Sequence, residues 1–440
     1  MSQPAVHEKA AKRRHRPSEE NATFLQRLGP GLITGAADDD PSGIATYSQV
    51  GAQFGMGMLW TMLFSFPLMD AMQEICGRLG RITGVGIAEN LRKHYSRPLL
   101  YALVSLLCIA NIFNLGADVS AMGAAAQLVF GGSLNAFALA FGIVSLLLQV
   151  YVPYKKYVRY LKWLTLVLFA YVATAFVVHV PWKSALHATF VPSFSWKAEY
   201  WMALVAVLGT TISPYLFFWQ TSEEAEDVRL NHHEQPLNKN PSQAAPQFRR
   251  IALDTRVGMA FSNLVAFFII LTTAVTLHAA GGAKGIQTSA DAAKALQPLA
   301  GHLAFLLFAL GIIGTGLLAV PVLAGSAAYA IAETFRWRAS LQKTARQAPK
   351  FYLVLAAATV IGISLNFVGL NPIRALYWSA VLNGIVAVPL MVVLMIMSAN
   401  AAVVGKFRLP AYLRIVGWAA TVVMFLASLA FLVSGIRGLF

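Results

Sequence analysis

The sequence predicts an all-α integral membrane protein with eleven transmembrane helices, and three observations carry this prediction. Of the 440 residues, 57% are hydrophobic and only 12% are charged, whereas a soluble protein contains about 25% charged residues. The mean hydropathy is +0.61. Apolar runs long enough to cross a bilayer recur along the chain, and the basic residues between them alternate in abundance.

Each predicted span is an apolar run of roughly 20 residues. The run 99–130 contains no turn signal, so we expect one helix there. The run 299–332 is longer than one span, which tilt or extension beyond the bilayer accommodates. The runs are 29–55, 58–77, 99–130, 134–152, 160–180, 199–220, 257–280, 299–332, 351–370, 373–399 and 411–436.

The basic residues predict the orientation of these spans. With the N-terminus in the cytoplasm, 28 of the 34 Lys and Arg residues fall in cytoplasmic segments, as the positive-inside rule requires. The chain is then a multi-pass protein of the inner or plasma membrane, with its C-terminus outside. The positive-inside distribution of Lys and Arg accounts for the net charge of +15. We therefore expect the lipid bilayer to be a partner and expect no binding of nucleic acid.

The spans predict two halves of five helices and one additional helix. A basic cytoplasmic tail covers 1–28, the first half covers 29–181, and the second half covers 198–399. The eleventh helix covers 411–438. Spans 1 and 6 therefore hold corresponding positions in the two halves.

Span 1 contains the run Asp38-Asp39-Asp40-Pro41-Ser42-Gly43. An ionised Asp at the centre of a membrane helix costs about 2.5–3.5 kcal/mol on insertion scales, which favours an ion or substrate site. Pro41 disfavours helical geometry at Asp40, and Gly43 permits unusual backbone angles. We therefore expect a helix break that exposes carbonyl oxygens beside a carboxylate, a combination that binds hard cations.

Span 6 contains a second candidate break, Gly209-Thr210-Thr211-Ile212-Ser213-Pro214-Tyr215. A plain proline kink, with the freed carbonyl bonded by a Ser or Thr hydroxyl, is the simpler interpretation. Interrupted helices at matching positions of two halves, however, indicate the binding site of a transporter near the membrane midplane.

The segment 221–249 is the most polar internal stretch and contains the acids Glu223, Glu224, Glu226 and Asp227. It is either a solvated cytoplasmic loop or an acidic rim at the inner end of span 6 that concentrates cations. The neighbouring His232-His233 pair is either ordinary surface or a metal sensor.

Several motifs resemble the natural resistance-associated macrophage protein (NRAMP) family. The spacing of Gly29-Pro30-Gly31 and Asp40-Pro41-Ser42-Gly43 is similar to the family's first helix. Gln73-Glu74 with the run 77–84 is similar to its second helix, and 210–216 is similar to its sixth. The resemblance implies a LeuT-type fold of two inverted five-helix repeats, with discontinuous helices 1 and 6 and an eleventh helix. It also implies transport of divalent metal ions without a cofactor.

The chain departs from the family pattern at several positions. Asp40 keeps the metal-binding carboxylate, whereas Gly43 replaces an Asn and is expected to leave room for something larger, such as water. Ser213 replaces a Met whose thioether suits softer metals. Tyr215 replaces a His and Leu115 replaces an Asp, both on the family's proton route, so proton coupling is left open.

The resulting prediction is a hard, all-oxygen metal site for Mg²⁺ or Mn²⁺, closest to the NRAMP-related magnesium transporters. Its metal ligands would come from Asp40, Gly43, Thr210 and Ser213. Successive helical residues point about 100° apart, so the three carboxylates cannot all face one ion. Asp39 would lie behind the direct ligands or in the inner vestibule, and Asp38 would lie there or at a solvated position in the inner cavity. The supporting residues would be Asp39, Ser42, Asp118, Tyr215 and Asn383.

The sequence leaves two roles open for each of Asp118 and Asn383, and it leaves more than one function open for the protein. Asp118 either helps to move the ion or a proton, or bonds the unwound part of helix 1. Asn383 either contacts the site or makes an interhelical hydrogen bond. The favoured function is a monomeric secondary transporter, a symporter or uniporter, and not an enzyme. The alternatives are an organic-substrate carrier, such as one for amino acids, of the same fold, or an intramembrane metal-dependent enzyme.

Overall fold

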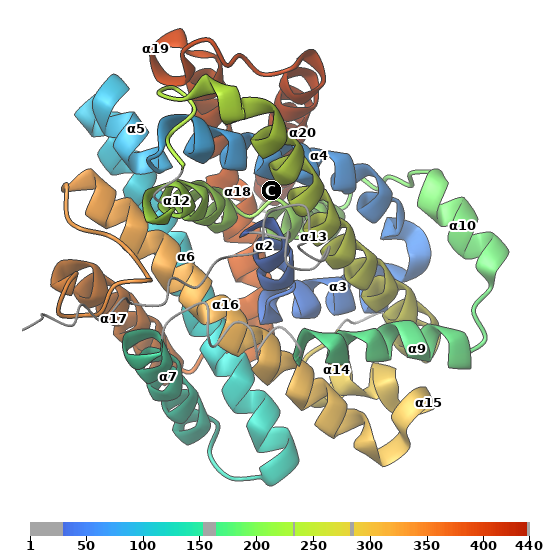
Figure 1. The fold of residues 1–440 in the computed structure, drawn as a ribbon. Helices are drawn as coiled ribbons and strands as arrows, with labels where there is room; N and C mark the ends of the chain where they lie inside the picture. The colour runs from blue at the N-terminus through green and yellow to red at the C-terminus, as the bar shows by residue number, and fades with distance from the viewer. Residues whose placement is uncertain (1–29, 153–163, 232–233, 282–285, 438–440) are drawn as a thin grey trace, which may run out of the picture.

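The computed structural model describes residues 30–152, 164–231, 234–281 and 286–437. The predicted tail 1–28, part of the fifth predicted span, the His232-His233 pair and the last residue of the predicted eleventh helix lie outside these ranges. The described residues form helices and no strand. Figure 1 shows α2 and α3 near the centre of the bundle, with long helices such as α6, α13, α16 and α18 around them.

The helix bounds agree with most of the predicted spans. The long run 99–130 lies within one helix, α6, whereas the run 299–332 begins in α15 and η7 and continues as α16. In chain order the elements are α2 (Pro30–Asp38), α3 (Pro41–Phe54), η2 (Gly55–Met58), α4 (Trp60–Thr83), α5 (Ile87–His94), α6 (Arg97–Phe130), α7 (Leu134–Tyr151), η3 (Leu164–Leu168), α9 (Phe169–Val177), α10 (Trp182–Phe190), α11 (Ala198–Thr211), α12 (Pro214–Leu230), η4 (Pro241–Gln243), α13 (Ala244–Thr273), η5 (Ala274–His278), α14 (Ser289–Ala293), η6 (Lys294–Leu296), α15 (Gln297–Ala300), η7 (Gly301–Leu303), α16 (Ala304–Thr334), α17 (Pro349–Ser364), η8 (Leu365–Val368), α18 (Pro372–Ala399), α19 (Ala401–Val404) and α20 (Ala411–Arg437).

Eight helical segments of the described part are long and apolar enough to cross a membrane, and they match predicted spans 3, 4 and 6 to 11. Predicted span 1 is divided into α2 and α3, and span 2 corresponds to α4, which contains four charged residues. Span 5 overlaps the shorter apolar segment Thr165–Val177. The total of eleven spans therefore stays a prediction.

Both predicted helix breaks are present. α2 ends at Asp38 and α3 begins at Pro41, so Asp39 and Asp40 lie outside regular helix. α11 ends at Thr211 and α12 begins at Pro214. In each case a proline takes the first helical position, where its missing N–H costs nothing.

Two glycine contacts bring the broken helices close to their neighbours. A Cβ atom on Gly35 of α2 would lie 2.3 Å from the backbone of Gly258 in α13, and one on Gly209 of α11 would lie 2.5 Å from the backbone N of Gly384 in α18. Neither contact leaves room for a side chain, since real Cβ atoms do not approach backbone atoms this closely. α3 also packs on α11, and α2 packs on α12, so the two breaks face each other.

The structure corrects the prediction of a solvated loop at 221–249. α12 continues to Leu230, and Glu224 and Glu226 are buried. Arg250 binds Glu224 at 2.5 Å, the buried Arg81 lies 3.9 Å from Glu224 and 3.4 Å from Asp227, and Arg81 also bonds Glu234. Glu224 and Glu226 therefore belong neither to a solvated loop nor to an open acidic rim, because basic side chains compensate Glu224 and the hydroxyls of Tyr329 and Ser340 bond Glu226.

Candidate functional site

The carboxylate of Asp40 is the centre of the candidate site. It caps the first turn of α3, where Oδ1 accepts hydrogen bonds from the Gly43 N–H at 2.7 Å and the Ser42 hydroxyl at 2.8 Å. Oδ2 lies 3.1 Å from Nδ2 of Asn114 and 3.3 Å from the Tyr215 hydroxyl. Neutral donors from α3, α6 and α12 therefore hold one carboxylate in a single orientation.

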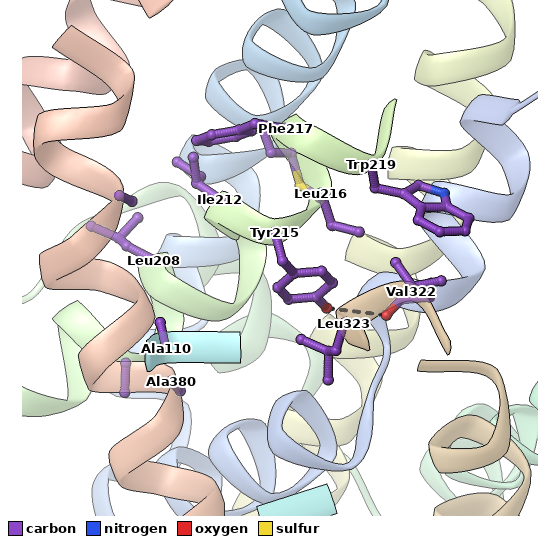
Figure 2. Packing of buried hydrophobic residues seen from close by; sticks show 14 of the residues in the cluster. Ala110, Leu208, Ile212, Tyr215, Leu216, Phe217, Trp219, Val322, Leu323 and Ala380 are labelled. Atoms are coloured by element: carbon purple, nitrogen blue, oxygen red, sulfur yellow. Dashed lines mark hydrogen bonds between the residues drawn. The ribbon is translucent and has the colours of Figure 1, made fainter. Parts of the chain in front are cut away.

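Tyr215 occupies the position where the family pattern has a His, and it joins the two helix breaks. Its hydroxyl lies within hydrogen-bond distance of Asp40 and of the Ala37 carbonyl, at 3.2 Å. Figure 2 shows its ring among the apolar side chains of α12 and α16, with a dashed line from the hydroxyl. The single hydroxyl proton thus links the first residues of α12 to the unwound part of the first broken helix.

A short polar chain extends from Asp40 through α6 to α18. The Asn114 amide donates to Asp40, and its Oδ1 lies 2.9 Å from the hydroxyl of Ser379. Asn383 follows Ser379 by four residues and so lies on the same face of α18. Asn383 is buried, and its amide has no hydrogen-bond partner within the described ranges. The interhelical bond considered for Asn383 is therefore absent, and its amide is available for a ligand.

Gly43 and Thr210 lie side by side across the two breaks. A Cβ atom on Gly43 would lie 3.1 Å from the Thr210 hydroxyl and 3.3 Å from the Asp38 carbonyl oxygen. The expected room beside Gly43 is wrong for this conformation, because the approach of α11 fills it with that hydroxyl. The absence of a side chain here allows the two broken helices to meet.

The Ser213 hydroxyl bonds backbone oxygens freed by the second break. It lies 3.0 Å from the Gly209 carbonyl and 2.8 Å from the Thr210 carbonyl. This is the pattern expected of a proline-interrupted membrane helix. Its proton is directed at these carbonyls, so only its lone pairs remain for an ion.

Asp38 and Asp39 form a second acidic group beside Asp40. The hydroxyl of Ser262 on α13 lies 2.6 Å from Asp38 Oδ2 and 3.1 Å from Asp39 Oδ1. The other oxygen of each carboxylate has no hydrogen-bond partner in the described residues. Both side chains are buried, so the solvated inner cavity considered for Asp38 is wrong in this conformation.

Asp118 on α6 is a fourth carboxyl group near the site, in addition to Asp38, Asp39 and Asp40 at the break between α2 and α3. It is buried close to Asp40 and to the backbone N–H of Ser42. Neither of its carboxylate oxygens makes a well-formed hydrogen bond among the described residues. Its role in ion movement stays a prediction.

Four buried carboxyl groups without a basic partner among the described residues are the electrostatic feature of this site. Asp38, Asp39, Asp40 and Asp118 are each at most 1% exposed. In the part of the chain that the structure describes, no ion pair joins them to Lys, Arg or His. Buried ionised groups are costly unless they are paired or bind a metal, so this site favours a cation.

The carboxylates do not converge as one cage. Among the residues described, no group of three or more His, Cys, Asp and Glu side chains is placed to hold a metal ion. An ion at Asp40 would therefore take its other ligands from hydroxyl, amide and carbonyl oxygens, which suit hard cations.

The site includes three residues that sequence reasoning did not assign to it: Asn114, Ser262 and Ser379. Asn114 carried the one usable signal, since it is a polar residue in an apolar span one residue before Leu115. A buried Ser in a membrane helix is common, because its hydroxyl often bonds its own backbone. Ser262 and Ser379 were therefore recognisable only once α13 and α18 were in place.

Two broken helices that meet at a buried carboxylate define the class of protein as a membrane transporter of the LeuT type. Solved structures confirm the fold. The manganese transporter of Eremococcus coleocola, in complex with an aromatic bis-isothiourea compound, covers 93% of this chain and 86% of its own, at 18% identity and a TM-score of 0.70. MhsT in complex with L-phenylalanine covers 94% and 98%, at 13% identity and a TM-score of 0.56.

The chain belongs to the natural resistance-associated macrophage protein (NRAMP) family, whose model matches residues 31–434. A curated relative, the divalent metal cation transporter MntH of Klebsiella pneumoniae (strain 342), is 25% identical over 404 residues and covers 90% of both chains. This membership confirms the resemblance seen in helices 1, 2 and 6. The protein is a transporter that needs no cofactor, and the alternative of an intramembrane enzyme is wrong.

Proposed function

We propose that this protein is a secondary transporter of divalent metal cations that carries Mg²⁺ or Mn²⁺ by alternating access around Asp40. The relative from Klebsiella is described as a divalent metal cation transporter and that from Eremococcus as a manganese transporter. The single observation that carries the proposal is the Asp40 carboxylate, oriented by four neutral donors at the junction of two broken helices.

The ligands we propose are all oxygen atoms. Asp40 supplies the charge, and the carbonyls of Ala37 and Asp38 belong to the last turn of α2, next to the break at Asp39 and Asp40. Thr210 and Ser213 add hydroxyl and carbonyl oxygens from the second break. Mg²⁺ and Mn²⁺ accept such hard ligands, whereas thioether and thiolate ligands favour softer metals.

The path to the cytoplasm is proposed to open through movement of α2. The Gly31 N–H donates to Asp254 of α13 at 2.8 Å, and the Thr34 hydroxyl bonds Gln220 of α12 at 2.5 Å. These two bonds tie the first half of the broken helix to its neighbours. α2 also packs closely on α13, where Gly35 lies against Gly258, so opening of this path requires these contacts to separate while α3 stays in place on α11 and α18.

An organic-substrate carrier is the competing function. The similarity to MhsT leaves it possible at the level of the fold, since one fold hosts many functions. A carrier of a carboxylated substrate binds that group at helix N-termini. Here Asp40 occupies the N-terminus of α3 and would repel such a substrate.

The decisive experiment is uptake into proteoliposomes that contain the purified protein and an internal pH dye. We expect saturable uptake of Mg²⁺, Mn²⁺ or both, each measured with its own indicator. Internal acidification during uptake would show proton symport, and a constant internal pH would show uniport. Failure to transport either metal, with accumulation of an amino acid in its place, would overturn the proposal.

A further inference from the structure

The segment between α16 and α17 carries an unusual concentration of positive charge. Residues 335–350 contain five basic residues and no acid. Their side chains form no ion pair with any residue that the structure describes. The five are Arg336, Arg338, Lys343, Arg346 and Lys350, and all are exposed.

Three stacked aromatic side chains, Tyr101, Phe335 and Trp337, lie beside these basic residues. Phe335 stacks on Tyr101 of α6 with ring centroids 6.4 Å apart, and on Trp337 at 5.2 Å. The ammonium of Lys350 lies 5.1 Å from the centre of the Trp337 ring. Phe335 is 52% exposed and Tyr101 is 47% exposed. An exposed aromatic surface at the end of a membrane helix is typical of the bilayer interface.

Arg336 holds an unfavourable backbone conformation in this segment. Its φ of +59° makes it the one non-glycine residue with a positive φ in the described ranges. It follows the last turn of α16, where the Trp337 N–H bonds the Ala332 carbonyl at 2.8 Å. Glycine is preferred at such a position. Because a glycine would avoid this strain, the presence of arginine suggests that its side chain has a function.

The position of Lys350 is electrostatically unfavourable, because its positive charge lies at the positive end of the α17 dipole. It lies in the first turn of α17, which begins at Pro349. The N-terminus of a helix carries partial positive charge, so a cation there is unfavourable and an anion is favoured. A bound anion would offset both the helix dipole and the side-chain charges.

We propose that this surface, made of Tyr101, Phe335, Arg336, Trp337, Arg338 and Lys350, binds the head groups of anionic phospholipids. The rings would lie at the level of the glycerol backbone, and the basic groups would contact the phosphates. With Lys343 and Arg346 nearby in the chain, the segment 335–350 supplies five basic residues in all. Clusters of four to eight basic residues directly cytoplasmic of a membrane helix bind anionic lipids. The contacts between α16, α6 and α17 hold the parts of the surface together (Figure 1).

The test is native mass spectrometry of the full-length protein titrated with phosphatidylglycerol or phosphatidylcholine. The variant is Arg336→Gln/Arg338→Gln/Lys350→Gln. Its matched control is Arg249→Gln/Arg408→Gln/Arg414→Gln, which removes three exposed basic residues on the same predicted side of the membrane. At about 1 kcal/mol for each basic residue, we expect the variant to bind phosphatidylglycerol on the order of 100-fold more weakly.

The control variant should bind phosphatidylglycerol within about 3-fold of the parent, and the parent should prefer it to phosphatidylcholine. Equal weakening in both variants, or equal binding of the two lipids by the parent, would overturn the site. If the triple variant does not fold, Arg338→Gln alone should weaken binding about 5-fold. An unchanged affinity in that single variant would also overturn it.

Discussion

Two groups of acids in this transporter, one at a helix break and one near the end of α12, have opposite surroundings. Asp38, Asp39 and Asp40 lie at a helix break and receive only neutral donors within the described residues. Glu224 and Asp227, on the last turns of α12, lie beside Arg81 and Arg250. Asp40 and Glu224 are shielded from water to the same degree, at 1% and 0% exposed, whereas the side chain of Asp227 is 40% exposed.

The presence or absence of a basic partner distinguishes acids that stabilise the fold from acids that are placed to bind a ligand. At the end of α12, fixed cations balance the acids and hold α4, α12 and α13 together, so opening this end would separate charges. At the helix break no fixed cation lies beside the acids in the described part, which leaves Asp40 free to bind the cation that we propose as cargo. If a Lys or Arg side chain paired with Asp40, that side chain would occupy the carboxylate and would compete with a transported cation.

Removal of the fixed cation should have the largest effect. Arg81→Gln leaves Glu224, Asp227 and Glu234 without their shared partner. Loss of one member of a buried ion pair costs about 3–5 kcal/mol of stability. We expect a clear fall in the thermal unfolding temperature in detergent.

Arg256→Gln is the control for this prediction, because Arg256 binds Asp70 at 3.3 Å and is 53% exposed. Because Arg256 is half exposed, water screens this pair, and its loss should cost less than the loss of the buried Arg81. If the two variants lost the same amount of thermal stability, the buried cluster would not be the fixed, balanced half of the comparison.

The reverse result is expected at the helix break. Asp40→Asn keeps the shape of the side chain and removes its charge, so a divalent cation loses its charged ligand. Loss of one partner of a buried charge pair costs about 2–5 kcal/mol, and metal uptake should fall about 30-fold or more. The unfolding temperature should not fall, because no cationic side chain of the described residues is left unpaired.

Asp70→Asn is the matched substitution for Asp40→Asn, since Asp70 lies on α4 and pairs with the exposed Arg256. Uptake by this variant should stay near that of the parent. Uptake by Asp40→Asn at the parent's rate would remove Asp40 from the metal site.

The amide that orients Asp40 should have an intermediate effect. Asn114→Leu removes a donor to a charged group, which is worth about 1.5–3 kcal/mol. We expect KM for the metal to rise about 10-fold or more, with a smaller change in maximal rate, measured by uptake at varied metal concentration. Asn111→Leu, one turn earlier on α6, is the control, because Asn111 bonds Leu323 and Ser326 of α16. Equal KM values in the two variants would make Asn114 a structural residue only.

The smallest expected effect concerns which metal is preferred. Ser213→Met returns a thioether to the second break, and thioethers favour soft cations. The ratio of Cd²⁺ to Mg²⁺ binding should rise about tenfold, equal to about 1.4 kcal/mol. Isothermal titration of the purified protein with each metal measures this ratio, and Ser213→Ala separates the added sulfur from the lost hydroxyl. A Cd²⁺ preference that rises equally in both variants would contradict the argument from ligand hardness.

Local chemistry made the two helix breaks predictable. Pro41 and Pro214 cannot continue a helix that precedes them, and Gly43 and Ser213 are placed beside them, so the interruptions at Asp39–Asp40 and Ile212–Ser213 follow from a few adjacent residues. The same holds for Asp40 as the capping residue of α3.

The fate of the acids on α12 was not predictable in this way. Glu224 and Asp227 are separated from Arg81 by about 140 residues in the chain, and nothing local indicates that the cluster is buried. The space beside Gly43 was mispredicted for the same reason. Its size depends on how closely α11 approaches, and that depends on packing between distant glycines such as Gly209 and Gly384.

The sequence by itself determined that the chain is a membrane protein with two interrupted helices and a carboxylate at the first interruption. These features depend on hydrophobicity and on the backbone limits of proline and glycine, which act over a few residues. The tertiary structure alone decided which acids lie beside basic side chains and which receive only neutral donors among the described residues. That assignment depends on side chains from α4, α6, α13 and α18 that become neighbours only when the helices pack.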